Sequence, residues 1–73
     1  MESNVLKEIG SQLKKLRIEK ELTQEKLAYL TGTDPSYIRK VESGKVNISV
    51  KRLYAIASSL EISLSELFSS IND

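Results

Sequence analysis

The sequence predicts an all-α domain of five short helices packed around one hydrophobic core. Apolar residues recur every three or four positions along most of the 73-residue chain, which is the period of an amphipathic helix. Residues that favour the first position before a helix, namely Thr, Asp and Ser, stand in front of four of these apolar stretches. The β-branched residues are scattered at helical spacing and do not alternate, so no stretch is typical of a β-strand.

The first two helices are predicted from their apolar faces and their ends. Ile9 and Leu13 lie on one face of a helix that ends near Lys20. Thr23 is a favourable N-cap for a second helix over residues 24–30, which carries its apolar residues on one side. The glycine that follows this segment breaks the helical pattern and predicts a tight turn.

The third helix, residues 34–43, has signals at both of its ends. The side chain of Asp34 can accept backbone N–H bonds, and Pro35 suits the first helical position because its ring fixes φ near the helical value. Gly44 is placed to end the helix in a left-handed conformation. The sequence therefore predicts a short helix whose position is fixed at both ends.

Two further helices complete the predicted fold. Ser49 caps a fourth helix that extends to Leu60, and Ser63 with Glu66 fits a capping box that starts a short fifth helix. The predicted core consists of the apolar positions that share helical periodicity: Ile9, Leu13, Leu16, Leu27, Ala28, Ile38, Val41, Leu53, Ile56, Ala57 and Leu60.

Composition excludes several classes of function. The chain has no Cys and no His, which excludes disulfides, zinc fingers and histidine-based catalysis, and no cluster of acidic residues suggests a metal site or an enzyme pocket. No apolar run approaches the length of a membrane span, and the N-terminus lacks the form of a signal peptide. We therefore expect a single cytoplasmic domain over residues 1–73, with no metal, cofactor or small-molecule ligand and no enzymatic activity.

The net charge of +1 conceals an uneven distribution along the chain. Residues 1–52 carry all eleven Lys and Arg and seven acidic residues, a net charge of +4, whereas residues 53–73 carry three acidic residues and no basic one. Chance in a short chain is one explanation. The other is that one part of the domain faces a polyanion and the other part faces away from it.

The third helix carries polar and cationic residues on its outer face. Ile38 and Val41 form its buried stripe, whereas Ser36 and Lys40 lie opposite, with other polar side chains on the flanks. Simple solvation is the usual explanation of such a face. The helix is however short, capped at both ends and preceded by another short helix and a tight turn, an arrangement that predicts a helix-turn-helix over about residues 23–43.

The residues of this segment resemble the helix-turn-helix of the phage-repressor-like (Cro/Xre) family. The resemblance covers roughly residues 9–68 and implies a lambda-repressor-like fold that binds double-stranded operator DNA in transcription regulation. The shared elements are Thr23-Gln24-Glu25, Leu27-Ala28, Gly32, Ile38, Val41-Glu42 and Gly44.

The short members of this family that have no ligand-binding domain include the controller proteins of restriction–modification systems. The pairs Tyr37-Ile38 and Ile48-Ser49, the latter preceded by Asn47, are similar to those of controller proteins. One departure is Pro35, where controller proteins often carry Arg. Proline cannot form a bidentate contact with guanine, so the resemblance does not predict the operator sequence.

The resemblance implies roles for the polar residues of the motif. Gln24 and the backbone N–H groups at the start of its helix match the family's phosphate clamp, and Ser36 and Lys40 are candidates for contacts with base edges. Tyr37 has two readings, either a contact with a thymine methyl group or a phosphate, or half-buried packing. The predicted DNA-binding residues are Thr23, Gln24, Ser36, Tyr37, Arg39, Lys40, Ser43, Lys45 and Asn47.

Other residues are predicted to have structural roles. In this family, the positions of Arg17 and Glu42 form an ion pair that joins the first helix to the third and fixes the pitch of the reading helix. Lys51 and Arg52 are candidates for further phosphate contacts, although solvation is the simpler explanation for each.

The C-terminal part is predicted to form a homodimer interface. Segment 61–73 contains more apolar surface than a small core can cover and carries no positive charge. The proposed interface residues are Leu64, Leu67, Phe68 and Ile71. An antitoxin or a protein-interaction module on the same fold is the alternative function, and it predicts weak, salt-insensitive retention on heparin.

Overall fold

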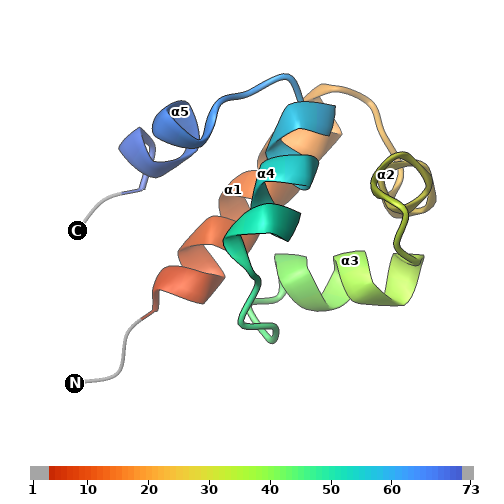
Figure 1. Cartoon of the computed structure of the whole chain (residues 1–73), viewed down its shortest axis with the longest axis horizontal. Helices are drawn as coiled ribbons and strands as arrows, with labels where there is room; N and C mark the ends of the chain where they lie inside the picture. The colour runs from red at the N-terminus through yellow and green to blue at the C-terminus, as the bar shows by residue number, and fades with distance from the viewer. Residues whose placement is uncertain (1–3, 72–73) are drawn as a thin grey trace.

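The computed structural model describes residues 4–71, and this part of the chain contains five α-helices and no strand (Figure 1). The helices are α1 (Val5–Glu19), α2 (Gln24–Thr31), α3 (Pro35–Glu42), α4 (Val50–Ser59) and α5 (Leu64–Ser69). The predicted all-α class with five helices is confirmed. The predicted domain 1–73 and dimerisation segment 61–73 also include residues 1–3 and 72–73, which lie outside the described residues.

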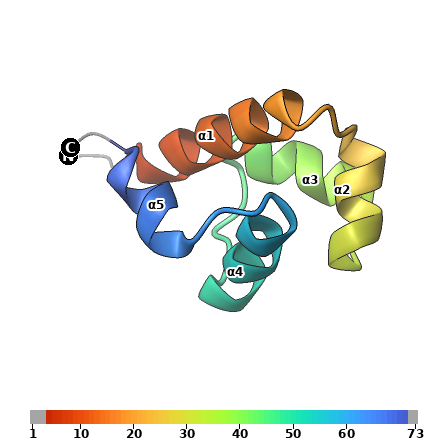
Figure 2. The same ribbon diagram turned by 90° about the horizontal axis from the view of Figure 1, so that it is seen from above.

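The helices are arranged so that α2 and α5 lie at opposite ends of the molecule (Figures 1 and 2). Helix α3 packs against α1 and α2, α2 also packs against α4, and α5 packs against both α1 and α4. The helix-turn-helix formed by α2 and α3 is therefore remote from the C-terminal helix.

Three helices begin at the capping residues that the sequence predicts. The hydroxyl oxygen of Thr23 accepts the N–H of the third residue of α2 at 3.0 Å, and that of Ser49 does the same for α4 at 3.2 Å. The predicted capping box of α5 is complete, because Ser63 accepts the Glu66 N–H at 3.0 Å and the Glu66 carboxylate accepts the Ser63 N–H at 2.9 Å.

Two connections between helices share one backbone conformation that the sequence does not predict. Glu21 follows the end of α1 at φ 58°, and Glu61 follows the end of α4 at φ 60°, both in the left-handed region that favours glycine. In each turn the N–H of the next residue, Leu22 or Ile62, donates at 3.0 Å to the carbonyl oxygen five residues earlier. Both helices therefore end in a left-handed turn in which Glu occupies the position that glycine usually takes.

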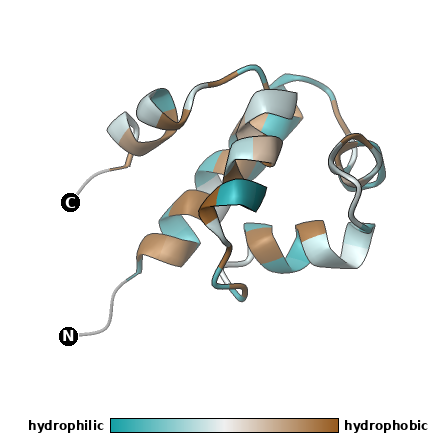
Figure 3. Ribbon diagram, viewed as in Figure 1, coloured by the Kyte–Doolittle hydropathy of each residue, from teal (hydrophilic) through white to brown (hydrophobic). Residues whose placement is uncertain are grey.

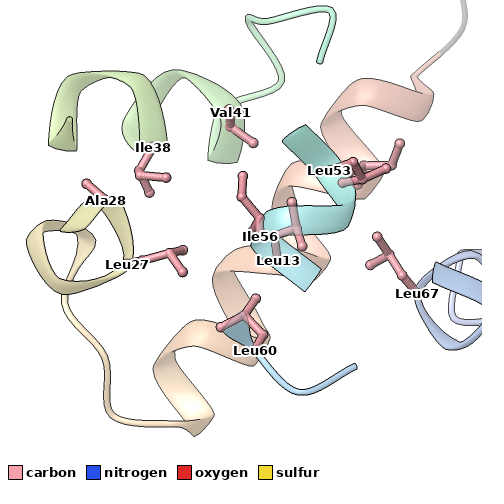
Figure 4. Close-up of a cluster of buried hydrophobic side chains, with 10 residues drawn as sticks. Leu13, Leu27, Ala28, Ile38, Val41, Leu53, Ile56, Leu60 and Leu67 are labelled. Atoms are coloured by element: carbon pink, nitrogen blue, oxygen red, sulfur yellow. The ribbon is translucent and has the colours of Figure 1, made fainter. Parts of the chain in front are cut away.

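The core is formed by apolar side chains from all five helices. Hydrophobic and hydrophilic residues alternate in bands along α3 and α4 (Figure 3), and the buried side chains converge between the helices (Figure 4). All but one of the predicted core residues are buried. The exception is Leu16, which is only partly buried: Ile9, Leu13 and Arg17 follow one another at four-residue intervals along α1, and Arg17 takes the last buried position.

Helix α5 corrects the prediction of which C-terminal residues are free to bind a partner. Leu67 has no exposed surface because it fills the core between α4 and α1, so it cannot form part of a dimer interface (Figure 4). Leu64 and Ile71 are partly buried and pack against the same core. Of the four proposed interface residues, Phe68 has the most accessible side chain, with 47% of its surface exposed.

Candidate nucleic-acid interface

Helix α3 is held at both ends by the interactions that the sequence predicts. The Asp34 carboxylate accepts the N–H of Tyr37 at 2.8 Å, and Pro35 occupies the first turn. At the other end Gly44 adopts φ 75°, and its N–H donates to a carbonyl in the last turn at 3.0 Å. The N–H of Lys45 donates to the Lys40 carbonyl at 2.9 Å, which completes a Schellman motif.

The turn between α2 and α3 is short and internally bonded. Gly32 adopts φ 69°, and the Thr33 N–H donates to the Ala28 carbonyl at 2.9 Å. The hydroxyl groups of Thr31 and Thr33 lie 3.0 Å apart and form a hydrogen bond. The direction in which the chain leaves α2 is therefore fixed, and with it the angle between α2 and α3.

The outer face of α3 carries the predicted candidates for base and phosphate contacts. Ser36, Arg39 and Lys40 are exposed, whereas Ile38 on the opposite side is buried. Tyr37 is half-buried, and the guanidinium group of Arg52 in α4 lies 5.2 Å from the centre of its ring. The face is thus cationic and accessible, with one aromatic side chain at its flank.

The remaining predicted contacts lie beside this face, and some already have local bonds. Thr23 is exposed, but its hydroxyl oxygen serves as the N-cap of α2. Ser43 donates its hydroxyl hydrogen to the Arg39 carbonyl at 2.7 Å. Lys45 and Asn47 are exposed in the loop after α3, where the resemblance predicts backbone contacts.

A buried polar network joins the first three helices. Arg17 Nε donates to Glu42 Oε2 at 2.6 Å, and Arg17 Nη2 donates to Glu42 Oε1 at 3.1 Å, so the predicted ion pair is present and bidentate. Arg17 Nη1 also donates to the Leu22 carbonyl at 2.7 Å. The two charged side chains expose only 9% and 4% of their surface, and burial of this kind is tolerated only when the charges are paired and hydrogen-bonded.

Gln24 belongs to the same network, through a hydrogen bond to Glu42 that the sequence does not predict. Its amide nitrogen donates to Glu42 Oε1 at 3.0 Å, so that this oxygen accepts from both Arg17 and Gln24. One amide hydrogen of Gln24 is thereby used within the protein, and the side chain is held at the start of α2. The phosphate clamp remains a prediction, with the second amide hydrogen and the backbone N–H groups as its donors.

Gly10 is a residue of this site that sequence reasoning missed. A Cβ atom built on Gly10 would lie 2.7 Å from the Glu42 carbonyl oxygen and still closer to that of Val41. Only a glycine allows the backbones of α1 and the end of α3 to approach so closely. The signal available in the sequence was a glycine inside a helical pattern. Glycine there costs about 1 kcal/mol relative to alanine, which indicates that the position has a packing or functional role.

Residues 4–71 contain no group of three or more acidic side chains that could hold a metal ion. None of the helices over this range is long and apolar enough to cross a membrane.

Comparison with known proteins places this geometry in a family. The Helix-turn-helix family model (HTH_3) matches residues 13–67, more than half of the chain. The control protein C.MunI from Mycoplasma sp is 48% identical over 63 residues, which cover 85% of this chain and 85% of that protein.

Two solved structures share the same fold. The restriction–modification controller protein C.AhdI from Aeromonas hydrophila matches with a TM-score of 0.85 and 41% identity, covering 90% of this chain and 100% of that one. The controller protein C.Esp1396I, solved as a tetramer in complex with its natural 35 base-pair operator, matches with a TM-score of 0.84 and 38% identity, covering 94% of this chain and 91% of that one. The chain belongs to the Cro/Xre-type helix-turn-helix family, and its relatives include restriction–modification controller proteins.

Proposed function

We propose that this protein is a homodimeric transcription regulator that binds operator DNA as a controller protein. The observation that carries the proposal is the outer face of α3, where Ser36, Arg39 and Lys40 are exposed on a helix fixed at both ends. The Asp34 cap fixes the start of this helix, and the bidentate ion pair of Glu42 with Arg17 ties its end to α1, so the face is presented at a defined angle. The similarity to C.Esp1396I, which binds its operator, supports the same use of this face.

In this proposal α3 enters the major groove and α2 lies across the phosphate backbone. Lys40 donates to guanine O6 and N7, and Ser36 forms an adaptable hydrogen bond. Arg39, Lys45 and Asn47 contact the phosphates on either side, which positions the protein without reading sequence.

The network around Glu42 gives the phosphate clamp its orientation. Glu42 holds one amide hydrogen of Gln24, so the other points away from Glu42. A carboxylate this close to the clamp would repel a phosphate if it were unpaired. The two hydrogen bonds from Arg17 compensate that charge and tie the clamp to α1.

We propose that residues 1–73 act as one domain, without enzymatic activity or a cofactor, in the cytoplasm, where the operator DNA lies. A two-fold pairing through the end that carries α5 leaves α3 of each subunit free to reach the duplex. The exposed Phe68 is the proposed centre of that pairing.

Selection of bound duplexes from a random DNA pool tests this function. We expect a pseudo-palindromic site whose half-sites lie about 10–10.5 bp, or a multiple of this distance, apart. Binding should weaken steeply with salt, because each neutralised phosphate releases counterions. An enriched pool without any common sequence, together with salt-independent elution from heparin, would instead support a protein-interaction module.

A further inference from the structure

The ring of Tyr37 lies at the edge of the face that α3 presents. Tyr37 is in the first turn of α3, beside Ser36, and its backbone N–H is bonded to the Asp34 cap. Its ring packs partly against the core, and within residues 4–71 the phenol hydroxyl has no hydrogen bond. The cap therefore fixes the backbone of Tyr37, whereas the position of its ring is set by the side chains that pack against it.

Arg52 covers one side of that ring from a different helix. It stands in the first turn of α4, where its N–H is bonded to the capping hydroxyl of Ser49 at 3.2 Å. Its guanidinium carbon lies 5.2 Å from the ring centre of Tyr37, within the range of a cation–π interaction. Arginine suits this position because its planar group stacks on an aromatic face, which lysine does less well.

The ring is closely packed on its inner side, where the hollow that it shares with Ala55 and Ile56 has a volume of only about 10 Å³, but it is open on its outer side. A hollow of about 280 Å³ is lined by Gly32, Thr33, Asp34, Tyr37 and Arg52. Another hollow, of about 290 Å³, also borders Arg52 and is lined in addition by Thr31, Ser49, Lys51 and Ala55. Without Arg52 the outer side of the ring would lose the side chain that covers it.

We propose that Arg52 is a specificity-determining residue, which holds the ring of Tyr37 against one base pair of the operator. The proposal rests on the proposed function and deepens it. Arg52 acts through Tyr37 and is a positioning residue. Removal of Arg52 should therefore change which sequence is preferred, and not only how tightly DNA is bound.

The test is a double-mutant cycle with the full chain and the best duplex selected from a random pool. Arg52→Ala, Tyr37→Ala and the double variant are titrated against this duplex and its single-base-pair variants. We expect Arg52→Ala to reduce discrimination at one base pair of each half-site by about two- to fivefold, the factor that corresponds to an exposed cation–π interaction. In the Tyr37→Ala background the same substitution should leave discrimination unchanged.

Lys51 provides the matched control, since it is an exposed cation on the same turn of α4. Lys51→Ala removes the same charge and should weaken all duplexes by one common factor. Arg52→Lys keeps the charge, and we expect it to lose part of the discrimination while retaining the salt dependence. Unfolding midpoints of all variants establish that the differences arise from the folded protein.

Three results would overturn the proposal. A uniform loss of affinity for Arg52→Ala, with a smaller salt dependence, would make Arg52 a phosphate contact only. An equal loss of discrimination with and without Tyr37 would show that Arg52 acts by another route. If Tyr37→Ala keeps every base preference, Tyr37 reads no base and the inference fails. The proposed function still stands in that case if the selected site is bound, and it fails separately if no site is selected.

Discussion

In the proposed function, Lys40 is one of the two residues of α3, with Ser36, that are expected to contact base edges. It is exposed on the outer face, and the carbonyl of its own residue is engaged in the Schellman motif that ends the helix. Its amine can therefore reach outward from a backbone that is hydrogen-bonded at the end of the helix. Arg39 is also exposed, but the sequence places it on the flank of the face.

We expect Lys40→Ala to lose about 1–3 kcal/mol of binding free energy on the preferred operator and to relax preference at one base pair of each half-site. Gln24→Ala and Arg39→Ala should weaken binding to all sequences nearly equally, because phosphates carry no sequence information. Titration against an operator and its single-base-pair variants at several salt concentrations measures both effects. If Lys40→Ala keeps every base preference, Lys40 is a phosphate contact.

Glu21 is strained by the left-handed conformation of the turn after α1. A non-glycine residue in that conformation destabilises the folded state by about 1–2 kcal/mol. Glycine removes this strain, but it also increases the conformational entropy of the unfolded chain, which lowers stability by about 0.4–1 kcal/mol. The strain is the larger effect, so Glu21→Gly should raise the free energy of unfolding by about 0.5–1 kcal/mol. Chemical denaturation measures this change.

Glu19→Gly is the control for that substitution, because Glu19 is exposed and lies within the last turn of α1. Glycine inside a helix is about 0.5–1 kcal/mol less favourable than alanine, and glutamate is itself a good helix former. Glu19→Gly should therefore lower the free energy of unfolding. Opposite signs at two positions so close in sequence would isolate the effect of backbone conformation. Equal destabilisation at both would mean that Glu21 is not strained.

At the scale of elements, the contact between α1 and α3 depends on Gly10. The backbone carbonyls at the end of α3 occupy the space that a Cβ would need, and backbone atoms cannot move aside as a flexible side chain can. Gly10→Ala must therefore displace one helix relative to the other. Because α3 is the proposed reading helix, the displacement has a consequence for binding as well as for stability.

We expect Gly10→Ala to lower the free energy of unfolding by about 1–3 kcal/mol, the usual effect of overpacking, despite the better helix propensity of alanine. Operator affinity should fall even at temperatures where the variant is folded. Ser11→Ala, at an exposed neighbouring position of α1, is the control and should be neutral or slightly stabilising. Unchanged stability for Gly10→Ala would contradict the close approach.

A second link between elements joins the two left-handed turns. Lys20 Nζ donates to Glu61 Oε1 at 2.6 Å, between the α1–α2 and α4–α5 connections. The hydrogen bond and the charge of Lys20 lower the pKa of the Glu61 carboxyl below its ordinary value. The link contributes stability above the unfolded-state pKa of Glu61, and the contribution is lost as pH falls through the lowered folded-state value.

We expect Lys20→Ala to raise the pKa of Glu61 back toward its ordinary value, and high salt to reduce the difference because both side chains are accessible. NMR titration of the Glu61 carboxyl carbon measures this directly. Lys15→Ala, which removes an exposed cation elsewhere on α1, should leave the titration of Glu61 unchanged. Identical titration curves for Lys20→Ala and the unmodified protein would disprove the link.

At the scale of the whole molecule, one side of α5 packs into the core and the other side is exposed. Leu67 closes the core against α1 and α4, and Phe68 is exposed at the end remote from α2 and α3. Exposed apolar side chains also occur on α4, where Val50 and Tyr54 lie one turn apart. Stability of the subunit and its association with a second copy should therefore be separable by substitution at neighbouring positions.

We expect Leu67→Ala to lower the free energy of unfolding by about 2–5 kcal/mol, as for other fully buried leucines. Phe68→Ala should weaken the dimer and leave the unfolding of the monomer nearly unchanged. Sedimentation across a range of concentrations, combined with chemical denaturation, distinguishes the two effects. A monomer at tens of micromolar that Phe68→Ala does not alter would place the dimer interface elsewhere.

The sequence by itself determined the five helices, the capping residues at which α2, α3, α4 and α5 begin, the end of α3, the helix-turn-helix and the family. These features depend on short-range interactions: Asp34 bonds an N–H three residues on, and Gly44 closes its own helix. The left-handed turns at Glu21 and Glu61 escaped prediction because glutamate carries no signal for that conformation.

Only the tertiary structure decided which residues meet across helices. Gln24 reaches Glu42 across 18 residues of sequence, Arg52 covers the ring of Tyr37, and Leu67 faces the core. The Arg17–Glu42 pair, which spans 25 residues, is predicted through the family resemblance and not from any pattern within one helix. Periodicity predicts that a side of a helix is apolar, but not what covers it. The covering element is selected by the packing of the whole chain, and a pattern within one helix contains no information about that packing.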